Sequence, residues 1–209
     1  MSGLVLHGFV TFLVTIDPLG VAVAFAGLMH DAPETMRRRM ASRAVIVATG
    51  LIAAFAAFGE PLLQALGISM SAFRIAGGIL LFLLATDMVF ARPSGIRNPT
   101  GPEQEEANRS EDISVFPLAF PLLAGPGALT SVVLLIGGAD GAFGLLGIVL
   151  TLAMVLALTF AALIASSYVM RILGVTGTNV VGRVLGIILA ALAAQYVVDG
   201  IVEIMQRGA

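Results

Sequence analysis

Residues 4–29 read LVLHGFVTFLVTIDPLGVAVAFAGLM, an apolar run that is interrupted near its middle by Asp17 and Pro18. A helix that crosses a bilayer needs about 20 predominantly apolar residues, so this run is long enough for one span. Further runs of this kind occupy residues 44–65, 73–91, 113–137, 142–170 and 183–205. The sequence therefore predicts an all-α membrane protein with six transmembrane helices in a single domain, residues 1–209.

The composition supports burial in lipid. Of the 209 residues, 58% are hydrophobic and 11% are charged, whereas globular domains are closer to about half and a quarter. The basic residues are not clustered with aromatics, so no nucleic-acid partner is expected. The chain has no Cys, no His pair and no phosphate-binding loop, so we expect neither an enzyme, a metal site nor a bound cofactor.

The Arg residues predict the orientation in the membrane. Nine of them lie in or beside three connections between spans: Arg37, Arg38, Arg39, Arg43, Arg92, Arg97, Arg109, Arg171 and Arg183. Only Arg74 and Arg207 fall on the opposite side. Because connections rich in Arg remain in the cytoplasm, both termini are predicted to lie outside it. Residues 171–182 are expected to form one of these connections, as a loop.

The two halves of the chain resemble each other. Residues 17–20 (DPLG) align with 125–128 (GPGA), 66–69 (LGIS) with 173–176 (LGVT), and 74–77 (RIAG) with 183–186 (RVLG). Biased Gly and Leu content could also produce such matches, but repeats are common in transporter folds. Three spans per half require the second half to begin on the opposite side. We therefore predict two inverted repeats, about 1–91 and 113–209, joined by a cytoplasmic loop, 92–112.

Each half has a break in its first span. Asp17-Pro18 lies near the middle of residues 4–29, and Gly125-Pro126-Gly127 near the middle of residues 113–137. Proline removes a backbone donor and clashes with the preceding turn, so both spans are predicted to be discontinuous. A simple kink is the alternative, and it is the interpretation preferred for Pro61. Two breaks at matching positions nevertheless indicate a transporter's binding site near the membrane midplane.

The chemistry of this site suits a small zwitterion. A helix that begins at either break presents unpaired N–H groups and a positive dipole end to an anion. The Asp17 carboxylate and the carbonyls that end the preceding half-helices suit an ammonium group, and Asp17 is also the candidate for ion or proton coupling. The predicted substrate-binding residues are Asp17, Pro18, Leu19, Gly20, Gly125, Pro126, Gly127, Ala128, Thr130 and Ser131.

Residues 116–128 read FPLAFPLLAGPGA and closely resemble the signature of the MarC family, and residues 17–20 (DPLG) resemble its first-half motif. The resemblance covers the whole chain in length and in the number and order of spans. It implies a six-span protein of the inner membrane. It also implies transport of small neutral amino acids such as glycine and alanine, driven by an ion or proton gradient. Some relatives carry Asn at the position of Asp17, so coupling through this carboxylate is not general to the family.

Three functions remain to be distinguished. The first is a secondary transporter of small neutral amino acids that alternates access around spans 1 and 4. The second is a transporter or channel for another small solute, such as an organic anion. The third is a membrane accessory protein without transport activity. The lipid bilayer is a partner in every case, and a homo-oligomer is compatible with the sequence.

Overall fold

The computed structural model describes residues 2–91, 112–139 and 141–207, and every element in these ranges is a helix. The elements are α1 (Ser2–Ile16), α2 (Pro18–Leu28), α3 (Glu34–Ala65), α4 (Met70–Phe90), η1 (Ser114–Leu123), α6 (Pro126–Gly137), α7 (Gly141–Ile164) and α8 (Ser166–Arg207). Five segments are long and apolar enough to cross a membrane, or six if η1 and α6 together form one span. The prediction of an all-α, multi-pass membrane protein is confirmed.

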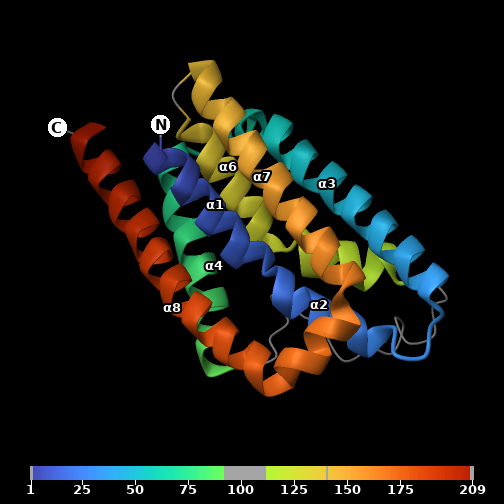
Figure 1. The fold of residues 1–209 in the computed structure, drawn as a ribbon. Helices are drawn as coiled ribbons and strands as arrows, with labels where there is room; N and C mark the ends of the chain where they lie inside the picture. The colour runs from blue at the N-terminus through green and yellow to red at the C-terminus, as the bar shows by residue number, and fades with distance from the viewer. Residues whose placement is uncertain (1, 92–111, 140, 208–209) are drawn as a thin grey trace.

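The helices form one bundle with both chain ends at the same end of the molecule (Figure 1). α4 and α8 make the most extensive helix pair. Their backbones approach closely because glycines face the partner helix. A Cβ atom on Gly78 would lie 2.8 Å from the Ala193 carbonyl oxygen, and one on Gly186 would lie 3.0 Å from that of Ala85. Small residues at such crossings allow the backbone approach that stabilises helix pairs in lipid.

The two halves of the chain are interleaved. α1 and α2 pack against α7 of the second half, while η1 and α6 pack against α3 of the first half. α1 also contacts α6. The first span of each half therefore lies beside the second span of the other half, and the two first spans meet between them.

The prediction of a loop at residues 171–182 is wrong. α8 runs through this region, with a single non-helical residue at Gly174 (φ 59°, ψ −173°). Its polar residues support the helix, since the Thr178 hydroxyl donates to the Gly174 carbonyl at 2.9 Å. A helix leaves fewer backbone groups unpaired than a loop does, which favours it at the membrane boundary.

The other basic connections differ in what the structure describes. Arg37, Arg38, Arg39 and Arg43 belong to α3, which begins at Glu34 rather than after a basic loop. The predicted cytoplasmic loop 92–112 lies outside the described residues except for Asp112. Arg92, Arg97 and Arg109 therefore lie outside them too.

Candidate substrate site at the two helix breaks

The first break consists of one residue. α1 ends at Ile16 and α2 begins at Pro18, and Asp17 between them is left-handed (φ 47°, ψ 75°). Asp is among the few residues other than Gly that tolerate this conformation. Asp17 Oδ1 accepts a hydrogen bond from the Gly20 N–H at 3.1 Å, and proline suits the first helical position. Asp17 thus caps α2, while Val5–Leu28 still reads as one apolar span.

The second break is larger. η1 and α6 are bent by 55° relative to each other. Within η1, Phe116 (φ −129°, ψ 128°) and Phe120 (φ −132°, ψ 130°) are extended. Both precede a proline, which disfavours the helical conformation of the residue before it. The breaks are therefore different in kind, since only the second redirects the chain strongly.

The start of α6 lacks a side-chain cap. Gly125 is the N-cap residue and makes no side-chain hydrogen bond, in contrast to Asp17 at the start of α2. The first N–H groups of any helix have no partner within the helix. Pro126 carries no N–H, so the donors at this end belong to Gly127 and Ala128. These donors lie at the positive end of the α6 dipole, which favours an anion.

The two breaks meet in the interior. A Cβ atom on Gly127 would lie 3.9 Å from the Cβ atom of Thr15 and 2.7 Å from Leu84 Cδ2 of α4. Thr15 precedes Asp17 by two residues, so the start of α6 lies against the end of α1. Asp17 is buried, with 6% of its surface exposed. A carboxylate and an uncapped helix end therefore share one buried region.

The predicted site residues occupy this region to different extents. Six of them are buried: Asp17, Pro18, Gly127, Ala128, Thr130 and Ser131. Four are half-buried: Leu19, Gly20, Gly125 and Pro126. Thr130 packs its methyl group against Gly77 of α4, where an added Cβ would lie only 2.4 Å away. The structure therefore places the α6 start against Thr15, two residues before Asp17, and directs the Thr130 methyl toward α4.

Ser131 is the most unusual polar group of the site. Its side chain is fully buried, and its Oγ has no hydrogen-bond partner among the described residues. Ser131 follows Gly127 by four positions in α6, so the two lie on the same face of the helix. A buried hydroxyl without a partner is rare in native proteins, so Ser131 is a candidate to hydrogen-bond a substrate.

Sequence reasoning missed a polar stripe on α1. His7, Thr11 and Thr15 recur every four residues and therefore share one face. His7 Nε2 lies 3.1 Å from the hydroxyl oxygen of Tyr196 in α8. The Thr15 hydroxyl donates to the Thr11 carbonyl at 2.8 Å. The four-residue spacing of these polar side chains was the signal that could have revealed the stripe.

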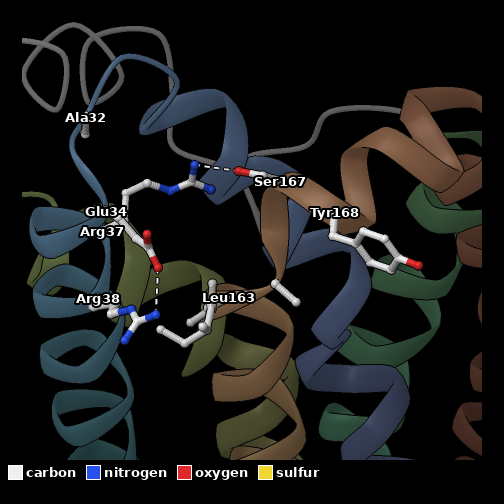
Figure 2. Close-up of a pocket in the computed structure, with 9 residues that line it drawn as sticks. Ala32, Glu34, Arg37, Arg38, Leu163, Ser167 and Tyr168 are labelled. Atoms are coloured by element: carbon white, nitrogen blue, oxygen red, sulfur yellow. Dashed lines mark hydrogen bonds and ion pairs between the residues drawn. The ribbon is translucent and has the colours of Figure 1, made fainter.

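A second polar region lies at the junction of α7 and α8 with the start of α3 (Figure 2). Arg37 donates to the hydroxyls of Ser167 at 2.6 Å and Ser166 at 2.7 Å, and its guanidinium lies 5.8 Å from the centroid of the Phe25 ring. The pocket beside it has a volume of about 350 Å³. Arg37 thus clamps α2, α3 and α8 together, and no residue of either helix break lines this pocket.

Asp112 fixes the entry to η1. It forms an ion pair with Arg43 of α3 at 2.8 Å and accepts hydrogen bonds from the hydroxyl and backbone N–H of Ser114. These hydrogen bonds, followed by the Arg43 charge, lower the pKa of the Asp112 carboxyl below its usual value. The start of the fourth span is thereby attached to α3 near the surface.

Comparison with known proteins assigns the family. A family model described as MarC family integral membrane protein matches residues 3–205. The chain belongs to the MarC family. MarC relatives include the UPF0056 membrane protein MJ1677 of Methanocaldococcus jannaschii, which is 35% identical over 193 residues, or 92% of this chain and 93% of the relative. No solved structure matches this MarC chain.

Two bacterial MarC relatives cover equally much of the chain. The UPF0056 inner membrane protein YhgN of Escherichia coli K12 is 34% identical over 197 residues, 94% of this chain and 95% of the relative. The UPF0056 membrane protein YvbG of Bacillus subtilis is 31% identical over 201 residues, 96% of this chain and 95% of the relative. The names of these relatives describe membrane proteins and specify no substrate.

Proposed function

We propose that this chain is a secondary transporter of small neutral amino acids, such as glycine and alanine, which binds its substrate at the two helix breaks. The observation that carries the proposal is the contact of the uncapped α6 start with Thr15, two residues before the buried break at Asp17. Irregular backbone at membrane depth is tolerated where it lines a site, and paired breaks of this kind hold substrates in transporters. Transport then proceeds by alternating access, in the inner membrane, with both termini outside the cytoplasm.

The structure favours one orientation for the substrate. The start of α2 is already occupied by the Asp17 carboxylate, which accepts from Gly20. The start of α6 has no such side chain, so the substrate carboxylate belongs there, on the N–H groups of Gly127 and Ala128. The negative charge of Asp17 then attracts the ammonium group. The sequence suggested that both helix starts would hold the anion, and the capping geometry supports α6 alone.

Several features support the proposed inverted repeat. α2 and α6 each begin with a proline, Pro18 and Pro126. Gly67 and Gly174, aligned in the sequence, both have positive φ angles (70° and 59°). The contacts of the first span of each half with the second span of the other half are also exchanged by such a symmetry. In this arrangement the two breaks flank the pseudo-two-fold axis.

The amino-acid site can be tested by counterflow of labelled glycine in proteoliposomes. Gly127→Ala adds a Cβ atom 2.7 Å from Leu84 Cδ2 at the α6 start. Crowding of about 1 to 3 kcal/mol predicts a loss of glycine affinity of about tenfold. Gly50→Ala is the matched control, because a Cβ atom there meets nothing within 4 Å. Counterflow absent from the wild-type protein under proton and sodium gradients would refute the transporter proposal.

A transporter of small organic anions is the second candidate, because the uncapped start of α6 alone could bind a carboxylate. Competition separates the two: unlabelled alanine inhibits an amino-acid transporter, and acetate inhibits an anion carrier. Asp17→Asn adds a further distinction, since removing the negative charge weakens zwitterion binding and strengthens anion binding. A non-transporting accessory protein would keep its cellular phenotype when the site is filled by Gly125→Leu.

A further inference from the structure

We propose that the polar stripe of α1, with Tyr196 of α8, is the route by which protons reach Asp17 from the end of the molecule that holds the termini. This inference rests on the proposed function and adds a coupling route to it. The route consists of His7, Tyr196, Thr11 and Thr15. Three of these lie on one face of α1, at the four-residue spacing that aligns side chains along a helix.

Polar groups follow one another along the route, and hydrogen bonds join His7 to Tyr196 and Thr15 to the Thr11 backbone. His7 Nε2 and the Tyr196 hydroxyl lie 3.1 Å apart. The Tyr196 hydroxyl interacts with the Thr11 side chain, whose Oγ1 is buried and makes no regular hydrogen bond. The Thr15 hydroxyl lies one turn further and donates to the Thr11 carbonyl. Thr15 then precedes Asp17 by two residues.

Burial separates the route from lipid and bulk water. Thr11 is fully buried, Thr15 is 5% exposed and Tyr196 is 8% exposed, while His7 at the start of the route is half-buried. Groups that titrate at neutral pH are costly inside a membrane and therefore mark proton or ion pathways. Since His changes its charge between about pH 5 and 8, it is suited to collect protons at the entrance.

Within the described part of the chain, the charged groups near the entrance come from α4 and α8. Asp199 of α8 is exposed and interacts electrostatically with His7 and Tyr196. Arg74 of α4 pairs with Glu203 of α8 at 3.0 Å and also influences Tyr196. α6 and α7 pack on the other sides of α1, and neither helix carries a charged residue. The acidic side chains therefore supply protons from one direction only.

The transfer conserves protons and moves no electrons. His7 takes one proton from water and passes one to the Tyr196 oxygen, while the phenolic proton moves to the Thr11 hydroxyl. Thr11 passes its own proton to the Thr15 hydroxyl, which turns away from the Thr11 carbonyl to reach Asp17. The relay groups return to their starting protonation, and the Asp17 carboxylate is neutralised. Loss of that charge weakens its attraction for the substrate ammonium group.

The experiment separates coupling from transport in proteoliposomes. Glycine exchange at equal pH on both sides needs no net proton movement, whereas accumulation driven by a pH gradient does. His7→Gln retains a hydrogen-bonding side chain but cannot titrate, and Tyr196→Phe removes one hydroxyl. Each is expected to retain exchange and to lose pH-driven accumulation by about tenfold or more. His30→Gln is the matched control, because His30 is exposed and lies between α2 and α3.

Each outcome decides the inference. If His7→Gln and Tyr196→Phe accumulate glycine as well as His30→Gln does, the route is wrong although transport stands. If the wild-type protein exchanges glycine but a pH gradient drives no accumulation, the route is also wrong. If the wild-type protein shows no exchange, both the proposed function and the proton route are wrong.

Discussion

Replacing Ser131 with alanine should make the substrate-free protein more stable and should weaken substrate binding. The Ser131 hydroxyl is fully buried in α6 and lacks a hydrogen-bond partner among the described residues. Burying a hydroxyl without a partner costs about 1 to 3 kcal/mol. Ser131→Ala removes this cost and one oxygen atom, so the free energy of unfolding without substrate should rise by about 1 kcal/mol.

Substrate should reverse the sign of this effect. If Ser131 donates to a bound carboxylate, its removal forfeits a hydrogen bond to a charged group, worth about 1.5 to 3 kcal/mol. The dissociation constant for glycine should then increase by about 10- to 100-fold. The measurement is thermal unfolding of the purified protein in detergent, with and without a glycine titration.

Ser114→Ala provides the matched control. Ser114 is also buried, with 1% of its surface exposed, but its hydroxyl donates to Asp112. Its replacement should lower stability and leave the glycine titration unchanged. The explanation of Ser131 is refuted if Ser131→Ala lowers the unfolding temperature without substrate, or if its glycine affinity equals that of the wild-type protein.

Five further substitutions, at four positions, test other contacts by unfolding in detergent. Asp17→Asn should leave the free energy of unfolding unchanged, because Asn also caps helices and tolerates left-handed angles. Asp17→Ala should lower the free energy of unfolding by about 1 to 3 kcal/mol. Equal losses for the two variants would contradict the capping role. Gly78→Val should cost about 1 to 3 kcal/mol by separating α4 from α8, and an unchanged unfolding temperature would contradict their close approach. Arg37→Ala should lower the free energy of unfolding by about 1 to 3 kcal/mol, because it leaves the buried Ser166 hydroxyl without its donor. Arg38→Ala breaks only an exposed pair with Glu34 and should lower the free energy of unfolding by less than about 1 kcal/mol.

The sequence was most informative where chain length and local stereochemistry determine structure. Apolar runs near 20 residues identify spans because the bilayer sets their length. The prolines at 18 and 126 identify the starts of α2 and α6, because proline is compatible with a first helical turn and not with the turns that follow. The conclusion that the protein is an all-helical membrane protein needed no more than these features.

Features that depend on tertiary contacts could not be predicted in the same way. Residues 171–182 contain Gly, Thr and Asn and resemble a loop, but Gly174 absorbs the irregularity in one residue and α8 continues. Asp17 caps α2 from a left-handed conformation. An Asp residue tolerates this conformation, but the sequence does not require it. Likewise, the bond between His7 and Tyr196 joins residues at opposite ends of the chain. Composition and spacing carry little information about such pairs.

The interleaving of the two halves constrains how the protein could move. α1 and α2 rest on α7, and η1 and α6 rest on α3, so a displacement of α7 must carry helices of the first half with it. A rocking motion of one half against the other would separate helices that pack directly against each other. If transport proceeds as proposed, any rigid body that moves must therefore combine helices from both halves of the chain.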